Sequence, residues 1–556
     1  MHARPLLTGV LVFVLVSAPL LGRASTPSVD ESPSTRPPGQ GVVWAPPSHP
    51  GPALRTLDAM HARGVTAIRL ESLPPADTVW ARADALDLRL FVDLPTSAVS
   101  GADLETALRN ARPALQKIQQ LARTHPSIRA VGLGPGVDTS VRAACAPLQT
   151  WTQRVHNRSP RLHTYYVTPF TAAHDQCREA VDLLLLDTRG RDDPIERWHR
   201  WESTDATVGI GALGTWTTPD APAGLNVPHS PQRQARHLER ALSSLTDPNT
   251  VKAPPVFIYR WQDEASAFPP GRRYGLHNRA GNARPAAEVV RGFYTGQQRV
   301  FAFSSGTAPS TAPVVAILLS WVLVALLGGL YARNPFVRQT VSRYFAAHGF
   351  YRDAVQKGRD VGPIENLVLL GGVGIALGII GALTAQISAP QPEMTLLLDA
   401  LPPQVQTMIA PGLTHPTLTG LVVGGLTVVL MLVWNALLVL TAQFEGTFSM
   451  AQGLMLITWP CWPALLGMLI ALVAAIRPPV PTGLLGLLLL LGGIGTILAV
   501  TIRVLRDYWA VSGVSWPWVL LLLLPSPLIV TLVGLILLVT AYDLPVSLLW
   551  HLVTRT

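Results

Sequence analysis

Residues 181–186 read VDLLLL, a run that is apolar on both faces of an extended chain. Strands of this kind belong to parallel sheets that helices cover on both sides. Seven further runs share the pattern, at 41–45, 65–70, 88–93, 128–133, 162–167, 206–211 and 255–261. Helix-like segments lie between them, among them 51–63, 103–124, 139–156 and 229–246.

Eight strand–helix units in about 255 residues match the size of a (β/α)8 barrel. We therefore predict an α/β fold for residues 41–300, a closed TIM barrel. A doubly wound open sheet is the alternative, because periodicity does not reveal whether a sheet closes on itself.

The second half of the chain is predicted to be an all-α bundle of six transmembrane helices, at residues 313–556. A small polar tether, 301–312, precedes it. The bundle contains six apolar spans of about the 20 residues that cross a hydrocarbon core. They lie near 313–332, 366–387, 417–441, 452–476, 482–502 and 517–541.

The amino-terminal 24 residues have the pattern of a signal peptide. A basic residue precedes an apolar run, and Gly22-Arg23-Ala24 provides a small-x-small cleavage site. An uncleaved membrane anchor is the alternative. Residues 25–40 are rich in proline and serine and are predicted to form a linker.

Basic residues predict the orientation of the chain in the membrane. The connectors 333–365 and 503–516 together carry eight Lys or Arg residues, against Arg477 and Arg555 on the other side. The positive-inside rule then places the barrel and the carboxyl terminus outside the cytoplasm, at a plasma or inner membrane. The lipid bilayer is thus a partner. Despite the net charge of +9, we predict no nucleic-acid binding, because export separates the barrel from nucleic acid.

The three cysteines predict no metal site. Cys145 and Cys177 would face an oxidising compartment. There they either form a disulfide or remain two separate thiols, depending on the distance between them in the fold. Cys461 lies in an apolar span and is expected to be a small buried side chain. No metal or other cofactor is predicted.

Four segments resemble the barrel of glycoside hydrolase family 2, the β-galactosidase and β-glucuronidase type. They are LDAMHARGVTAIRLESLPP (57–75), HPSIRAVGLGPG (125–136), VGIGALG (208–214) and YGLHNRAGNARPA (274–286). In the family, the segment that corresponds to 125–136 contains H-P-S followed by G-N-E, and the segment that corresponds to 208–214 reads T-E-F-G. The resemblance implies a TIM barrel that acts on or binds glycosides. The family's accessory β-domains have no counterpart here.

The family's catalytic glutamates are not retained. Carried over residue by residue, they fall on Gly136 and Ala212. A retaining glycosidase needs two carboxylates, one as acid/base and one as nucleophile, and neither glycine nor alanine supplies one. The resemblance therefore implies a degenerate barrel with no standard catalytic residues, which binds a glycan or another partner outside the membrane.

An active glycoside hydrolase with relocated carboxylates is the second hypothesis. Acids near the predicted strand ends could form an inverting pair, and Asp138 and Asp187 are the first candidates. They could equally be ordinary loop acids. Arg69 matches an arginine that supports the catalytic centre in the family; here it is expected to pair with Glu71 or Asp187, or to bind an anionic ligand.

Aromatic side chains near the strand ends could stack on sugar rings, and packing of the barrel mouth is their alternative role. The predicted substrate-binding set is Trp44, Arg69, Glu71, Trp216, Tyr259, Trp261 and Asp263.

The membrane part carries almost no ionisable residues within its spans, which disfavours a proton-coupled transporter. Its last five spans, with QFEGTF at 443–448 before the fourth, weakly resemble Yip-type five-helix domains. That resemblance implies a role in membrane organisation. A membrane-organising or transport protein with the barrel as sensor or cap is therefore the third hypothesis.

Overall fold

The computed structural model describes residues 39–74, 76–96, 103–202, 207–219, 221–246, 254–264, 272–307, 313–359, 362–389, 391–443, 448–476 and 482–555. The predicted signal peptide and nearly all of the predicted linker lie outside these residues, as do residues 444–447 of the QFEGTF segment.

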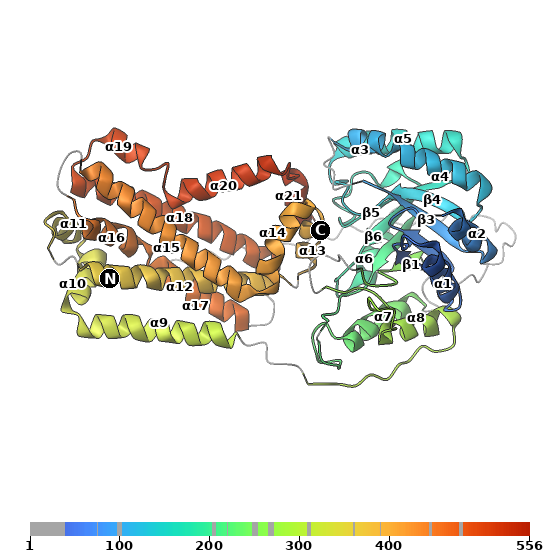
Figure 1. Cartoon of the computed structure of the whole chain (residues 1–556), viewed down its shortest axis with the longest axis horizontal. Coiled ribbons are helices and arrows are strands. Elements are labelled where there is room, and N and C mark those ends of the chain that lie inside the picture. The colour runs from blue at the N-terminus through green and yellow to red at the C-terminus, as the bar shows by residue number, and fades with distance from the viewer. Residues whose placement is uncertain are drawn as a thin grey trace, which may run out of the picture. The chain divides into compact units, whose positions relative to one another are not determined.

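The first part of the chain is a closed barrel of eight parallel strands in sequence order, β1 to β8 (Figure 1). The open-sheet alternative is therefore wrong, because β1 pairs with both β2 and β8. All eight predicted strands are confirmed, although the last is much shorter than expected. The strands are β1 (Gln40–Trp44), β2 (Ala67–Leu70), β3 (Arg89–Leu94), β4 (Ile128–Leu133), β5 (His163–Thr168), β6 (Leu183–Asp187), β7 (Val208–Leu213) and β8 (Val256–Ile258).

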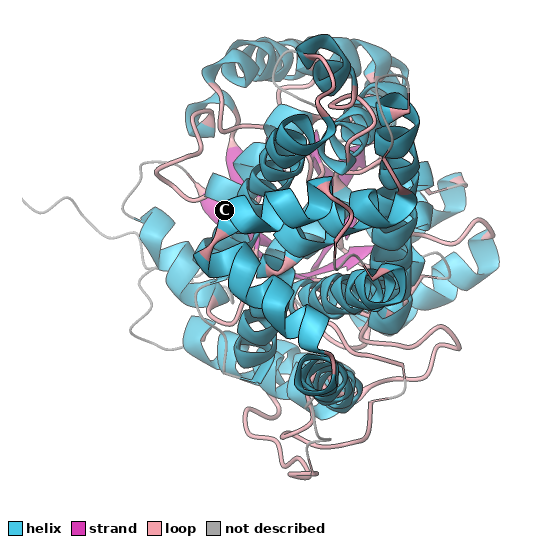
Figure 2. Ribbon diagram, turned by 90° about the vertical axis from the view of Figure 1, so that its left-hand side faces the viewer, coloured by secondary structure: helices cyan, strands magenta, loops and turns pink. Residues whose placement is uncertain are grey.

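Helices alternate with these strands along the chain, and the strands are the magenta segments behind cyan helices in Figure 2. The helices are α1 (Pro50–His61), α2 (Asp77–Ala85), α3 (Leu104–Asn110), α4 (Arg112–Thr124), α5 (Cys145–Arg158), α6 (Pro194–Glu202), α7 (Pro231–Leu245) and α8 (Pro285–Thr295). The β5–β6 crossover, unlike the others, contains only a short 3-10 turn, Arg178–Ala180. One of the eight predicted strand–helix units therefore has no α-helix.

Large side chains opposite glycines fill the barrel interior. A Cβ atom on Gly132 would lie 2.4 Å from the ring of Tyr165, and one on Gly41 would lie 2.5 Å from the ring of Phe257. Both rings are fully buried. The interior is thus packed with side chains rather than hollow, as is usual for eight-stranded barrels.

Cys145 and Cys177 form a disulfide, with 4.8 Å between their Cα atoms. The bond joins the start of α5 to the β5–β6 crossover, the segment without a helix of its own. It therefore fixes the least regular connection of the barrel.

The predicted tether 301–312 begins as part of the barrel. Phe301 is buried, and its N–H donates to Glu239 of α7. The carbonyls of Ser304 and Ser305 accept hydrogen bonds from the loop after β7, at Leu225 and Asn226. Only residues after these contacts connect the barrel to the helical part.

The second part of the described chain is helical. Four helices or continuous helical stretches are long and apolar enough to cross a membrane: α9 (Val314–Arg333), α12 (Pro363–Ser388), α15 (Pro416–Ala442) and the stretch Met450–Ala475, formed by α16 (Met450–Thr458) and α17 (Pro463–Ile476). A bent pair, α20 (Pro527–Ala541) with α21 (Val546–Arg555), raises the number to five if it counts as one span. The remaining helices are α10 (Pro335–Ala346), α11 (His348–Gln356), α13 (Pro392–Asp399), α14 (Pro403–Thr414), α18 (Thr482–Ser512) and α19 (Trp516–Leu521).

For the first four of the six predicted spans, the structure therefore has a helix or helical stretch of the expected length and apolarity. The expected fifth, 482–502, falls within α18. The expected sixth, 517–541, is not one helix, because the chain breaks between α19 and α20 at Pro525-Ser526-Pro527. A proline disfavours helical conformation in the residue before it, and Ser526 instead caps the start of α20 by accepting from the N–H of Ile529.

Glycines hold α12 and α15 close together. A Cβ on Gly378 would lie 2.7 Å from the carbonyl oxygen of Gly420, and one on Gly424 would lie 2.5 Å from that of Gly374. Each helix thus presents two glycines four residues apart to the other, the small-residue packing typical of membrane helices.

Candidate functional site

The carboxyl ends of the strands are where barrels of this kind carry their functional sites. Ala212 lies there in β7, fully enclosed, in register with Asp187 of β6. Gly136 follows β4 and has a φ angle of 119°. Residues other than glycine rarely adopt that backbone conformation, so position 136 favours glycine over any residue that carries a functional group.

A buried ion pair occupies the centre of this face. Arg69, 1% exposed at the end of β2, donates from Nη2 to Asp93 Oδ2 at 2.8 Å and from Nη1 to the Gly211 carbonyl at 2.8 Å. Tyr165 of β5 donates to the other oxygen of Asp93 at 2.6 Å. Burial alone would lower the pKa of Arg69, but the Asp93 carboxylate outweighs it and the pKa is raised.

The expected pairing of Arg69 with Glu71 or Asp187 is therefore wrong. Parallel pairing of β3 with β2 brings the end of β3 beside Arg69, so Asp93 reaches the guanidinium first. No external anion is needed to balance the charge of Arg69.

Asp187 pairs with Arg189, two residues later. Arg189 donates from Nη2 to Asp187 Oδ2 at 2.7 Å, and from Nη1 to Asp399 of α13 at 3.0 Å. Burial would raise the pKa of Asp187, but the charge of Arg189 outweighs it and the pKa is lowered. Asp187 is thus an ionised carboxylate with a fixed partner, whereas a general acid needs a raised pKa.

Two further acids of the predicted substrate-binding set are also paired with arginines. Glu71 binds Arg260, whose Nη1 also contacts Glu264 at 2.7 Å. Asp263 binds Arg284 at 2.5 Å and accepts from the N–H of Gly275. These ion pairs join the loops after β2 and β8 to each other and to the start of α8.

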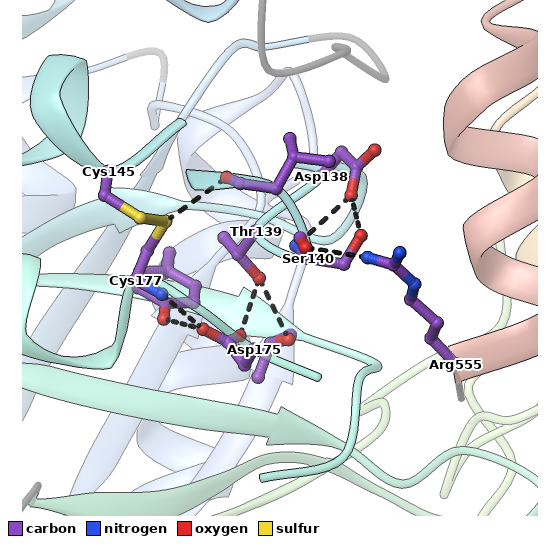
Figure 3. The surroundings of a disulfide bond; sticks show 10 residues. Asp138, Thr139, Ser140, Cys145, Asp175, Cys177 and Arg555 are labelled. Atoms are coloured by element: carbon purple, nitrogen blue, oxygen red, sulfur yellow. Dashed lines mark hydrogen bonds between the residues drawn. A yellow bond between two sulfur atoms is a disulfide. The ribbon is translucent and has the colours of Figure 1, made fainter. Parts of the chain in front are cut away.

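Asp138 lies in the loop after β4, 1% exposed (Figure 3). Its Oδ1 accepts from the hydroxyl of Ser140 at 2.5 Å, and its Oδ2 contacts Nδ1 of His551 in α21 at 2.9 Å. The carbonyl of Ser140 in turn accepts from Arg555 at 2.8 Å, as Figure 3 shows. Asp138 therefore has partners for both of its oxygens.

Asp175 is a buried acid in the same region that the sequence did not single out (Figure 3). It accepts from Thr139 at 2.6 Å, from Tyr166 at 2.7 Å and from the N–H of Cys177. Burial raises its pKa despite these hydrogen bonds. Because its donors come from the β4 loop, β5 and the disulfide, Asp175 anchors the helix-free crossover.

The predicted stacking aromatics have other rings or cations on their faces. Trp216 stacks on His229, with ring centroids 3.4 Å apart, and Arg272 lies 5.0 Å from the Trp216 centroid. Burial lowers the pKa of His229 to about 4, so its ring is neutral. Tyr259 packs against Arg189, 4.7 Å from its centroid.

The other two indoles, Trp44 and Trp261, are 3% and 4% exposed. Trp261 additionally packs against His277 and Arg63. Their positions at the strand ends are as expected, and their burial matches the packing role that was the alternative to sugar stacking.

Two helices from the second part of the chain contact the same strand-end face. Arg191 after β6 binds Glu393 of α13 at 2.6 Å. Phe170, after β5, is fully buried against apolar residues of α13, its C-cap and α21, namely Leu396, Ala400, Leu548 and Leu552. Together with the contacts of Asp138 and Arg189, these place α13 and α21 against the loops after β4, β5 and β6.

Among the described residues, no group of three or more His, Cys, Asp or Glu side chains could hold a metal ion. The residues that sequence reasoning missed are Arg189, Tyr165 and Asp175. Only Arg189 had a local signal, since it stands two residues after Asp187.

No protein-family model and no curated protein matches this chain. Similar solved structures include a family 2 β-galacturonidase from Eisenbergiella tayi bound to galacturonate, at 14% identity and a TM-score of 0.42, over 48% of this chain and 52% of that one. A β-glucuronidase from an uncultured Clostridium species has 15% identity and a TM-score of 0.40, over 45% and 47% of the two chains. A Ruminococcus gnavus β-glucuronidase in complex with D-glucaro 1,5-lactone has 14% identity and a TM-score of 0.39, over 46% and 49%.

The chain spans about half the length of these structures. The similarity is a distant one between barrels, and it carries no argument about activity or ligand. The weak resemblance of the helical part to Yip-type domains remains a prediction.

Proposed function

We propose that this chain is a membrane-anchored, glycosidase-like barrel that does not hydrolyse glycosides and whose strand-end face binds protein segments. One observation carries the proposal: the acids of that face are already held by cations and hydroxyls of the same chain. Asp93, Asp187, Glu71 and Asp263 each have an arginine partner, and Asp138 has Ser140 and His551.

Glycoside hydrolysis requires one carboxylic acid that gives up a proton and one carboxylate that attacks or activates water. A bound arginine favours the ionised form of a carboxylate and so opposes the first role. It also occupies the oxygens that the second role would use. An active enzyme with relocated acids would have to break these ion pairs before each turnover.

The contacts of α13 and α21 support a protein segment as the occupant of this face rather than a glycan. An apolar cluster around Phe170 and the polar contacts of Asp138, Ser140, Arg189 and Arg191 form one continuous interface. In this interpretation the barrel acts as a cap on the helical part, as the third hypothesis has it. A glycan ligand at the same loops would have to displace both helices.

We further propose that the barrel and the carboxyl terminus face the extracytoplasmic side. Support comes from the basic connectors 333–365 and 503–516, and from the disulfide, a bond that persists in oxidising compartments. Labelling of intact cells with a membrane-impermeant maleimide tests this. Cysteine at Arg299 should be labelled and cysteine at Lys357 should not; the reverse pattern would invert the topology.

The binding role is tested by a double-mutant cycle between Asp138→Asn and His551→Ala in the full chain, with hydrogen–deuterium exchange of barrel peptides across a urea series as the readout. Residues in direct polar contact couple by about 0.5–3 kcal/mol. Thr554→Ala is the matched control, because the Thr554 hydroxyl bonds within its own helix, to Trp550.

Coupling of Asp138 to His551 but not to Thr554 would support the cap. Independent effects of Asp138→Asn and His551→Ala would remove α21 as the occupant. Specific binding of the full chain on a glycan array, lost on Trp216→Ala, would favour the carbohydrate-binding hypothesis instead.

A further inference from the structure

Helices α9, α12 and α15 enclose an apolar groove of about 870 Å³. The three helices lie side by side in Figure 1, with α12 in contact with each of the other two. The groove is lined by the first two turns of α9, by α12 from Gly371 to Gln386, and by α15 from Pro416 to Val428. We call it the α12–α15 groove.

The groove exists because glycines are distributed unevenly along the two helices. Gly374 and Gly378 touch the backbone of α15, which leaves no room there. Gly371 and Gly425 also line the groove, yet a Cβ atom on either of them would meet nothing within 4 Å. The hollow therefore lies where these two glycines lack side chains.

The chemistry of the groove changes from one end to the other. Among the described residues that line the groove none is charged, and the two with polar side chains are Gln386 and Thr417. Gln386 is near the end of α12, and Thr417 is at the start of α15. The polar residues thus gather at one end of the helices, where Pro313 also leads into α9.

The length of the groove fits one leaflet of a bilayer. From Gly371 to Gln386, α12 rises by about 22 Å at 1.5 Å per residue. One leaflet, its polar headgroup region included, is about 20–22 Å thick. All three helices qualify as membrane spans, with mean hydropathies of 2.4, 2.3 and 2.3, so hydrocarbon surrounds the groove once they are inserted.

We propose that the α12–α15 groove binds one acyl chain of a bilayer lipid, whose headgroup lies beside Gln386 and Thr417. The apolar lining receives the chain, the polar end receives the ester and headgroup region, and the missing side chains of Gly371 and Gly425 provide the space. This inference concerns the helical part alone and does not depend on the proposed function of the barrel.

The experiment is photo-cross-linking of the full chain in nanodiscs that contain a phospholipid with a diazirine-labelled acyl chain. Cross-linked peptides are mapped by mass spectrometry. The groove is filled by the double variant Gly371→Leu/Gly425→Leu, which the open surroundings of both glycines should tolerate. Gly328→Leu on α9 is the matched control, since its Cβ would also meet nothing within 4 Å but it does not line the groove.

We expect cross-links to concentrate on 371–386 and 416–428, and to fall at least fivefold in the double variant but not in Gly328→Leu. Helix α20, which has no buried residue, supplies the background level of lipid contact. Equal labelling of α20 and the groove would overturn the proposal, as would unchanged labelling in a double variant that unfolds at the wild-type temperature.

Native mass spectrometry of the same samples separates the other occupants. The proposal is supported if the wild-type protein retains a mass equal to one whole phospholipid and the double variant does not. A retained free fatty acid, or a dimer that the double variant dissociates without loss of lipid, would overturn it.

Discussion

Replacing Arg69 by methionine removes the guanidinium that neutralises Asp93, a residue that is 5% exposed. Asp93 keeps the hydrogen bond from Tyr165, but loses the contacts from Nε and Nη2 of Arg69. Removing one partner of a buried ion pair costs about 3–5 kcal/mol, because the remaining charge keeps its desolvation penalty. We expect Arg69→Met to lower the free energy of unfolding of the barrel by that amount.

The assay is hydrogen–deuterium exchange of the full chain across a urea series, with peptides from β2, β3 and β4 as probes. These peptides report the barrel separately from the helical part, which thermal unfolding would not. Arg82→Met is the matched control, because Arg82 pairs with Asp58 while 44% and 46% of the two side chains are exposed. Exposed pairs of this kind contribute about 0–1 kcal/mol.

Adding Asp93→Leu to Arg69→Met should recover part of the lost stability, because the uncompensated charge is then gone. Equal costs for Arg69→Met and Arg82→Met would refute the reasoning. The reasoning would also be refuted if the double variant Arg69→Met/Asp93→Leu lost as much stability as Arg69→Met and Asp93→Leu lose together.

Three more predictions concern stability. Cys145→Ser removes a disulfide between residues 32 positions apart. Loop-closure entropy makes the expected loss in the free energy of unfolding about 3–4 kcal/mol, measured by urea unfolding. A wild type that, without reductant, is no more stable than the variant would contradict this. Gly378→Leu should lower the free energy of unfolding by about 1–3 kcal/mol, because the new side chain forces α12 and α15 apart. Gly371→Leu should lower it far less, since a Cβ there meets nothing within 4 Å. Thermal unfolding of both variants in detergent checks this. Burial lowers the pKa of His229 and of His237 from 6.5 to about 4, so the folded state binds fewer protons and stability should fall as pH drops from 6.5 towards 4. The urea midpoint of the double variant His229→Gln/His237→Gln should change less over that range, and an identical pH profile would count against the burial of both rings.

The strands could be predicted because each is apolar on both faces, a pattern that few other structures produce. The exception is β8, where the expected run 255–261 forms only three strand residues. Residues 259–261 leave the regular strand and contribute Tyr259, Arg260 and Trp261 to the mouth of the barrel. Ring and ion-pair contacts are added there to the backbone hydrogen bonds that Tyr259 and Trp261 still donate to Leu213 and Val43.

The candidate site could be located from the sequence but not assembled. Resemblance to a known barrel indicated that positions 136 and 212 lack carboxylates. It did not indicate that Asp93 would form the ion pair with Arg69, because that contact depends on the register and side-chain directions of the paired strands β2 and β3. The ion pair of Arg189 with Asp399 joins residues 210 positions apart, and no local pattern announces such a contact.

The helical part shows a different limit. Hydropathy located the first four long apolar helices correctly but passed over the break at Pro525-Ser526-Pro527, because the flanking residues remain apolar. It also gave no weight to the short helices α13 and α21, which lie outside the apolar spans. Those two helices make the contacts with the barrel face.

The absence of hydrolysis is tested most directly by the turnover of chromogenic β-glycosides, β-glucuronides and β-galacturonides included, by the full chain in nanodiscs. We predict no release above that of protein-free nanodiscs between pH 4.5 and 8, and no change on Asp138→Asn or Asp187→Asn. Turnover at enzyme-like rates that either substitution abolishes would contradict the account, because it would make a carboxylate that we assign to an ion pair or hydrogen bond a catalytic residue.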